Sequence, residues 1–362
     1  MKKTLKVALY ILLALVLIVL AYVIYVFAAY YRVEDWQTLS VVHCDAASAA
    51  PMADAPQTGV TYRVSSANVG FGAYSDDYSF FMDGGTSSWA ESPETVQYAI
   101  NGAGELVKSL DPDFALIQEI DLDSTRSYHI NEYEMLRSSL SEYTTVFAQN
   151  YDSAFLFYPF TQPHGSSRSG LGLFSRYPVS SALRRSFPIS TSFSKFFDLD
   201  RCYSVSRIPV DNGKELVIFN LHMSAYGNSD AIRKGQIEML CSDMQAEYKA
   251  GNYVLCGGDF NHDLKASEED TESCESWAFP FPRTELPEHF AFCLDLLSTE
   301  EQAALWNSAR NADMEYVPGV TYTVTLDGFI ISDNIECLSY ENVNTGYSYS
   351  DHDPVKVEFV LK

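Results

Sequence analysis

Basic residues are scarce in this chain of 362 residues, which has 24 Lys and Arg against 48 Asp and Glu and a formal net charge of −24. Four of the basic residues lie at positions 1–32, where there are no acidic residues, so the remainder has 20 basic and 48 acidic residues, a net charge of −28. Proteins that grip long nucleic acid need basic stripes to displace condensed counterions, and an acidic surface repels phosphate backbones at long range. The composition therefore disfavours long nucleic acid as a partner and favours a small or membrane-borne substrate.

Metal-binding cysteine motifs are also absent. The seven cysteines include no C-x-x-C pair, which excludes zinc held by cysteine. Cys202 and Cys256 lie in apolar, strand-like runs, where a cysteine acts as a small buried hydrophobic residue. Cys274 and Cys293 flank an irregular segment, and a disulfide between them in an oxidising compartment is one alternative, although two unpaired thiols are the favoured interpretation.

Charge is missing from one long stretch, since no charged residue occurs between Val7 and Tyr31. About 25 residues of helix span roughly 37 Å, which is enough to cross a bilayer. Lys2, Lys3 and Lys6 precede the stretch and only Arg32 follows closely, so the positive-inside rule places the N-terminus in the cytoplasm. We therefore expect a single-pass protein of the cell membrane whose main domain is extracytoplasmic.

A cleaved signal peptide is the alternative interpretation of this stretch. It is supported by the small residues Ala28 and Ala29. A secretory apolar core is usually about 7 to 15 residues long, however, and this stretch is longer. An uncleaved anchor is therefore favoured.

The chain divides by composition into an anchor at residues 1–32, a linker at 33–58 and a main domain at 59–362. The linker is small, Pro-bearing and aperiodic, as expected of a stalk. A hydrophobic content of 47% and an aromatic content of 14% allow the domain to bury a large core. We expect it to be a monomer.

Within this domain, many strand-like segments alternate with few helical ones. This pattern favours an α+β fold in which two packed sheets are covered by helices, rather than a doubly wound parallel sheet. The expected strands are 62–69, 114–120, 144–148, 170–175, 203–210, 216–222, 253–257, 324–331 and 355–361, and the expected helices are 93–110 with Ser92 as N-cap, 131–140 and 230–248.

Polar residues cluster at the ends of several of these apolar runs, where strands deliver side chains to the rim of a sheet. Glu119 closes one run, Asp259 and Asn261 follow another, and Asp351 and His352 precede the last strand. Asp259 and Asn261 are two residues apart and therefore point to the same side of an extended segment. Carboxylates that hold a divalent cation, with histidines facing an anion, are what hydrolysis of a phosphate ester needs.

Taken in order, these motifs resemble the endonuclease/exonuclease/phosphatase superfamily of metal-dependent phosphoesterases, over roughly residues 60 to 362. The resemblance implies a four-layer α/β/β/α sandwich. The positions that carry it are Asn68 in Ser65-Ser66-Ala67-Asn68-Val69-Gly70, Glu119 in Leu116-Ile117-Gln118-Glu119, His222 in Phe219-Asn220-Leu221-His222, Asp259 and Asn261 in Gly258-Asp259-Phe260-Asn261, and Ser350-Asp351-His352-Asp353-Pro354-Val355.

The resemblance also implies a metal set and a water-activating pair. Glu119 would bind Mg²⁺ with Asn68 and Asp351 beside it, and Mn²⁺ or Ca²⁺ are alternatives. Magnesium keeps several waters and needs few protein carboxylates, which suits so sparse a set. Asp259 would orient or deprotonate the attacking water, and Asn261 would hold that water or a phosphate oxygen.

Two histidines complete the implied site. His352 would donate to a nonbridging phosphate oxygen and stabilise the charge that grows there in the transition state. Asp327 lies where the family places a carboxylate that orients this imidazole. His222 resembles the second histidine that faces the phosphate.

These observations favour a membrane-anchored phosphoric ester hydrolase that acts on a lipid headgroup or a small phosphorylated molecule. Aromatic residues in segments 70–85 and 263–323 would either line a cleft for such a substrate or fill the core of a long insertion. An extracytoplasmic nuclease that cleaves DNA or RNA is one alternative. A binding module that keeps the fold but has lost turnover is another.

Overall fold

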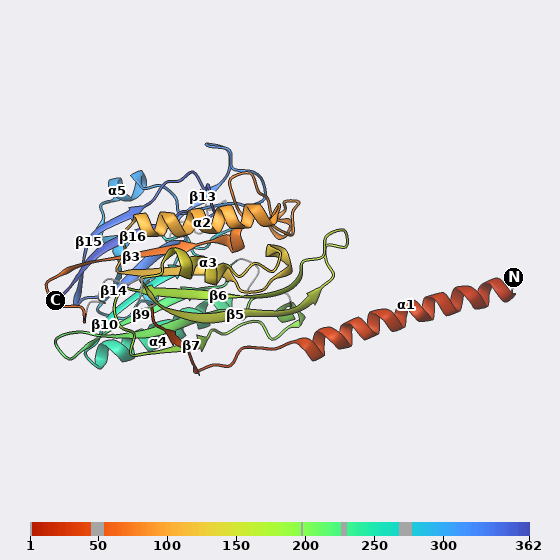
Figure 1. Ribbon diagram of the computed structural model, residues 1–362, viewed down its shortest axis with the longest axis horizontal. Helices are drawn as coiled ribbons and strands as arrows, with labels where there is room; N and C mark the ends of the chain where they lie inside the picture. Colours follow the sequence, from red (N-terminus) through yellow and green to blue (C-terminus); the bar gives the residue numbers. More distant parts are fainter. Residues whose placement is uncertain (1, 45–53, 197, 226–229, 268–276) are drawn as a thin grey trace.

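A computed structural model of the protein describes residues 2–44, 54–196, 198–225, 230–267 and 277–362 (Figure 1). Its main body consists of two mixed seven-stranded sheets packed face to face. Helices α2 (Pro93–Ser109) and α3 (Glu132–Ser139) cover one sheet, and α4 (Asp230–Lys249) covers the other. The predicted α+β fold, with helix, sheet, sheet and helix as its four layers, is confirmed.

We call the sheet beneath α2 and α3 the β3 sheet, and the sheet beneath α4 the β10 sheet. The β3 sheet contains one parallel pair, β3 with β4, and the β10 sheet contains one, β9 with β10. The remaining pairs within the two sheets are antiparallel. In spatial order the β3 sheet is β15 (Ile335–Asn342), β16 (Val355–Leu361), β3 (Thr61–Asn68), β4 (Phe114–Asp121), β6 (Gly165–Ser175), β5 (Thr144–Leu156) and β2 (Val41–Val42). The β10 sheet is β1 (Gln37–Thr38), β7 (Ser181–Ser186), β8 (Cys202–Pro209), β9 (Glu215–His222), β10 (Tyr253–Asp259), β14 (Asp327–Ser332) and β11 (Phe290–Phe292).

Strand β4 shows how the apolar runs build the layers. Its side chains alternate between the two faces of the sheet. Phe114 and Leu116 join the core between the sheets, whereas Ala115 and Ile117 join the core beneath α2 and α3. Because the strand is buried on both faces, its sequence is a continuous apolar run.

Helix α2 begins where its sequence predicts. The Ser92 side chain accepts a hydrogen bond from the Thr95 backbone N–H at 3.1 Å, and Pro93 occupies the first turn, where its missing N–H costs nothing. Val96, Ile100 and Val107 recur at helical spacing and are buried against the sheet.

Several elements differ from the sequence prediction. The run expected as one strand at 324–331 is split into β13 (Thr323–Val324), which pairs with β12 (Ala309–Arg310), and β14. Strands β7 and β15 and the short helix α5 (Thr299–Ala304) are additional to those predicted.

The segment expected as a stalk contributes β1 and β2, one strand to the edge of each sheet. Arg184 reinforces this attachment, because its guanidinium donates to the carbonyl oxygens of Val33 and Glu34. Residues 37–42 are therefore part of the sandwich, and residues 45–53 of the expected stalk lie outside the described residues.

The N-terminal helix α1 (Lys2–Ala29) extends away from the sandwich (Figure 1). Its residues Lys3–Ala29 are long and apolar enough to cross a membrane. A membrane anchor and a signal sequence both satisfy this test, and the orientation inferred from the flanking lysines stays a prediction.

One of the two cysteine predictions can be compared with the structure. Cys202 and Cys256 are fully buried in the hydrophobic core, which confirms their interpretation as small hydrophobic residues. Cys293 is a buried free thiol. Cys274, its proposed disulfide partner, lies outside the described residues.

Candidate active site

Strand ends from both sheets meet at one rim. Asn68, His222 and Asp259 are the last residues of β3, β9 and β10. Strand β14 is antiparallel to β10 and β16 is antiparallel to β3, so the segments that enter these two strands reach the same rim. In this way Asp327 of β14 pairs directly with Asp259 of β10. Asp351 and His352 both lie in the segment just before β16.

Glu119 reaches this rim through a β-bulge. By simple alternation it would follow Ala115 and Ile117 toward the helix layer. The register of β4 against β6 shifts between Ile117 and Ile120, and Glu119 has a positive φ of 56°. The bulge turns the carboxylate toward the gap between the sheets, which is a recognised use of bulges beside active sites.

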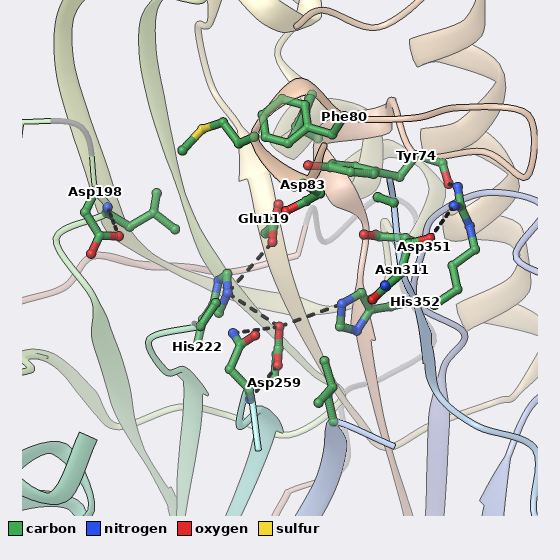
Figure 2. A pocket seen from close by; sticks show the side chains of 18 of the residues that line it. Tyr74, Phe80, Asp83, Glu119, Asp198, His222, Asp259, Asn311, Asp351 and His352 are labelled. Carbon is green, nitrogen blue, oxygen red and sulfur yellow. Dashed lines mark hydrogen bonds and ion pairs between the residues drawn. The ribbon is translucent and has the colours of Figure 1, made fainter. Parts of the chain in front are cut away.

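Asn68 connects the carboxylates of Glu119 and Asp259. Its Nδ2 donates to Glu119 Oε1 at 3.1 Å and to Asp259 Oδ2 at 3.2 Å. His222 Nε2 lies 3.4 Å from Asp259 Oδ2 and 3.8 Å from Glu119 Oε1 (Figure 2). Elements that are far apart in the sequence thus place two acids, an amide and an imidazole around one point.

The Asp259 carboxylate is fixed by its own turn. Its Oδ1 accepts from the Asn261 backbone N–H at 2.8 Å, and its Oδ2 accepts from Asn261 Nδ2 at 3.3 Å. Gly258 allows β10 to approach β9 closely, because a Cβ there would lie 2.1 Å from the carbonyl oxygen of Leu221.

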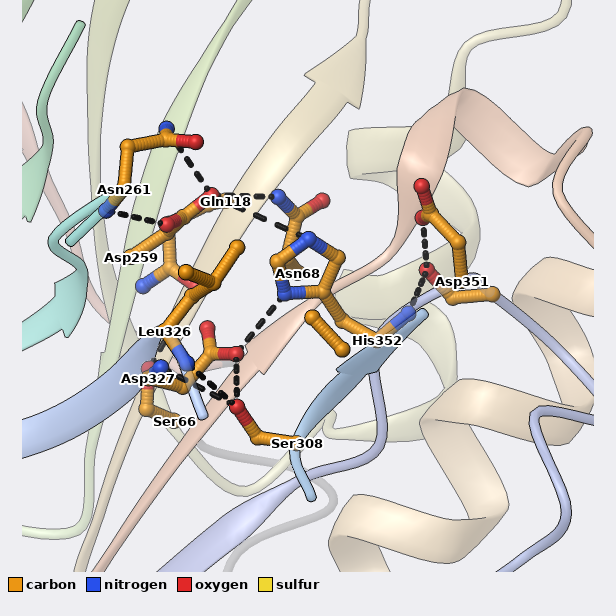
Figure 3. A network of polar contacts seen from close by, with 12 residues as sticks. Ser66, Asn68, Gln118, Asp259, Asn261, Ser308, Leu326, Asp327, Asp351 and His352 are labelled. Carbon is orange, nitrogen blue, oxygen red and sulfur yellow. Dashed lines mark hydrogen bonds and ion pairs between the residues drawn. The ribbon is translucent and has the colours of Figure 1, made fainter. Parts of the chain in front are cut away.

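His352 is held by a chain of polar contacts. Its Nδ1 lies 2.7 Å from Asp327 Oδ2, which also accepts from the Ser308 hydroxyl at 2.7 Å (Figure 3). Its Nε2 faces Asp259 at 3.9 Å. Burial opposes the charged imidazole, but the negative charges of Asp327 and Asp259 outweigh it and raise the pKa of His352 well above its usual value.

His222 has the opposite electrostatic balance. Burial, aided by the positive charges of Arg201 and His352, lowers its pKa well below the usual value, so the imidazole is neutral. Its Nδ1 is buried without a hydrogen-bond partner among the described residues. The two histidines therefore differ in charge, which residue type alone does not reveal.

The acidic side chains form a cluster that a cation would stabilise. Burial raises the pKa of Asp259 to about 7 and that of Asp351 to about 6, and the negative charge of Glu119 adds to both shifts. Burial, with the charges of Asp351 and Glu119, likewise raises the pKa of Asp83 to about 7. Carboxyls that are crowded and buried in this way favour either a proton or a metal ion.

The most compact set of donors consists of Glu119, His222 and Asp259, whose ligand atoms all lie within 4.8 Å of one another. This set overlaps only in Glu119 with the expected ligands Asn68, Glu119 and Asp351. The side-chain oxygen of Asn68 accepts from the Gly70 N–H at 3.0 Å, whereas Asp351 lines the same cavity as the compact set. The oxygen-rich donors and the unneutralised acids fit a divalent cation.

The rim opens into a cavity of about 590 Å³. One wall is aromatic or apolar, and Asp83 lies beside Glu119 at its edge (Figure 2). Arg201 also lines the cavity, and its buried Nε and Nη1 atoms make no hydrogen bond with the described residues. The apolar and aromatic wall includes Phe71, Tyr74, Phe80, Met82 and Trp277.

Asp83 and Arg201 were not assigned from the sequence. Asp83 lies in the aromatic segment expected at the site mouth, but no pattern distinguishes it from other loop acids. Arg201 precedes β8 directly, and it comes near His222 only because the next residue, Cys202, pairs with His222. In the later aromatic segment, Trp277 lines the cavity whereas Phe281 is fully buried, and a role of this segment in substrate binding stays a prediction.

Comparison with known proteins places the chain in a family. Residues 65–296 match the model of the Endonuclease/Exonuclease/phosphatase family, and the chain belongs to this family. It therefore has a phosphoesterase fold with a candidate metal site. A comparison with curated protein sequences gave no match.

Solved structures share the fold at low sequence identity. An endonuclease/exonuclease/phosphatase from Beutenbergia cavernae has a TM-score of 0.57 at 15% identity, covering 83% of this chain and 72% of the other. The corresponding protein from Bacteroides vulgatus has a TM-score of 0.54 at 16% identity, covering 84% and 100%. TDP2 from D. rerio, complexed with a single-strand DNA product, has a TM-score of 0.53 at 14% identity, covering 83% and 98%.

Proposed function

We propose that this protein is a divalent-metal-dependent hydrolase of phosphate esters, with Mg²⁺ as the expected cation and a lipid headgroup or small phosphorylated molecule as the substrate. The observation that carries the proposal is the convergence of Glu119, Asp259, His222 and His352 at one rim of a cavity. A bound divalent cation would neutralise phosphate oxygens and support a nucleophilic water.

The residues of the chain supply the remaining functions. Asp259, fixed by Asn68 and Asn261, is placed to take a proton from water. His352, charged and oriented by Asp327, is placed to donate to a nonbridging oxygen as negative charge develops. In this proposal Glu119 and Asp351 hold the cation, and neutral His222 faces the phosphate or the cation.

The cavity walls support an amphiphilic substrate. Arg201 has two buried nitrogen atoms, Nε and Nη1, that make no hydrogen bond with the described residues, although Nε lies 3.8 Å from Asp198 Oδ1. In this proposal they bind an anionic group next to the reacting phosphate. The aromatic wall offers an apolar surface for the rest of the molecule. The net charge of −24 remains an argument against long nucleic acid.

The test is a substrate panel given to the full chain in detergent with Mg²⁺. The panel contains phospholipids, sphingomyelin, inositol phosphates, nucleotides, DNA and RNA. We expect turnover of a lipid or small phosphate ester that is lost in Asp259→Ala and His352→Ala and retained in Asp333→Ala, an exposed aspartate at the far end of β14. Cleavage of DNA or RNA alone would favour the nuclease, and absence of any turnover that depends on Asp259 would support an inactive binding module.

A further inference from the structure

The hairpin between β5 and β6 ends in exposed aromatic side chains. Phe157, Tyr158 and Phe160, called the hairpin tip, are 52%, 62% and 85% exposed. Three large aromatic side chains close together on a surface usually mark a contact with a partner or a membrane. The mechanism proposed above does not use them.

Helix α1 joins the sandwich at the base of this hairpin. Tyr22 Oη donates to the Phe155 carbonyl at 3.2 Å, and Tyr25 Oη accepts from the Phe155 N–H at 3.1 Å. The Tyr22 and Phe157 rings pack edge to face with centroids 5.2 Å apart. From this point toward its N-terminus α1 leaves the domain (Figure 1). The large apolar side chains of α1 from Leu5 to Leu20 are exposed.

The length of α1 places the hairpin tip at a membrane surface. A hydrocarbon layer about 30 Å thick takes about 20 helical residues, which, counted from Lys6, ends near Val26. Tyr22 and Tyr25 lie in the turns just before this boundary, where tyrosine is enriched at the interface between lipid and water. The side chains that contact the hairpin are therefore those expected at headgroup level.

We propose that the hairpin tip is a membrane-docking surface. Phe157, Tyr158 and Phe160 enter the interfacial region of the same bilayer that α1 spans. Aromatic side chains suit this depth because each presents an apolar body to the lipid. The acidic net charge makes a zwitterionic surface the better partner, and insertion driven by apolar contact is insensitive to salt.

Docking would also orient the cavity. The Tyr158 ring lies 5.8 Å from Phe81, which lies 4.9 Å from Phe80 in the cavity wall. The hairpin tip is thus continuous with the aromatic wall, so docking would hold this wall close to the lipid. Docking of the hairpin tip does not depend on whether the protein hydrolyses a phosphate ester.

The test uses tryptophan fluorescence of the full chain in phosphatidylcholine vesicles that contain a spin-labelled lipid. Phe160→Trp places a reporter at the hairpin tip, and the emission of the wild type, with its four native tryptophans, is subtracted. Because Phe160 is 85% exposed, the change should not disturb folding. We expect the spin label to quench the added emission at least about twofold, equally at low and high salt.

Leu338→Trp is the matched control, because Leu338 is 48% exposed and lies on β15, at the end of the domain away from α1 (Figure 1). Its added emission should not be quenched. Equal quenching in the two variants, or no quenching in Phe160→Trp, would overturn the proposal. A blue shift in Phe160→Trp without quenching would also overturn it, because a protein partner or second copy would then cover the hairpin tip.

Discussion

Asp327 sets the charge of His352 through a contact of 2.7 Å. Without that carboxylate the pKa of His352 falls, because one of the negative charges that outweigh its burial is lost. Asp327→Asn should lower turnover by about 10- to 100-fold and shift the alkaline limb of the pH–rate profile to lower pH. The measurement is kcat against pH on the substrate found in the panel.

Asp333→Asn is the control for this prediction. Asp333 also pairs with a histidine, since its Oδ2 lies 2.7 Å from His289 Nδ1, but the pair is exposed and outside the cavity. Its loss should leave the profile unchanged. If Asp327→Asn lowered turnover without moving the alkaline limb, its role would be structural only.

Burial of His164 should make the stability of the folded protein depend on pH. Burial, with the nearby charge of Arg126, lowers its pKa from 6.5 to about 3 in the folded protein. Between these values the unfolded chain binds the proton that the folded chain excludes, so stability falls as the pH drops below about 6.5. At pH 5 this group alone accounts for a loss of about 2 kcal/mol.

His164→Phe removes this contribution. We expect the free energy of unfolding, measured with urea, to fall between pH 7.5 and pH 5 in both proteins. The fall should be about 2 kcal/mol smaller in the variant than in the wild type. A difference between the two proteins that does not change with pH would contradict the assignment of a buried neutral imidazole.

At the scale of elements, glycine in β10 sets the spacing between strands at the site. Gly258 has a φ of 139°, and a Cβ there would lie 2.1 Å from the Leu221 carbonyl oxygen. Gly258→Ala should therefore lower the free energy of unfolding by about 3 kcal/mol or more. Gly235→Ala in α4, whose Cβ would meet its nearest atom at 3.6 Å, should be neutral or stabilising by up to about 1 kcal/mol. Similar results for the two variants in urea unfolding would be inconsistent with close packing at Gly258.

Strand ends were predictable from the sequence because apolar runs followed by polar residues mark them directly. Asp259, His222 and His352 were placed at the rim by this pattern together with the family resemblance. The bulge at Glu119 was not predictable, since its φ depends on the register between β4 and β6. Arg201 and Ser308 were missed for the same reason, because only the assembled sheets bring Arg201 to the cavity and the Ser308 hydroxyl to Asp327.

At the scale of the whole molecule, two sheets bring acids from separate strands into one cluster with raised pKa values. Protons and a cation compete for these carboxyls, so cation affinity should rise as the pH increases through about 6 to 7 and level off at higher pH. Mg²⁺ should raise the thermal midpoint of the chelator-treated full chain, and more so at pH 8 than at pH 5.5. Glu119→Gln should reduce this shift, whereas Glu105→Gln, an exposed change on α2, should not. A shift of equal size at both pH values would argue against binding by these acids.

The proposed hydrolysis requires a cation site between the two sheets, and anomalous scattering from crystals of the full chain soaked in Mn²⁺ would locate that site. We predict a single strong peak within coordination distance of Glu119, beside Asp259 and His222. Crystals with no anomalous peak at this rim, or with manganese bound only elsewhere, would contradict the account.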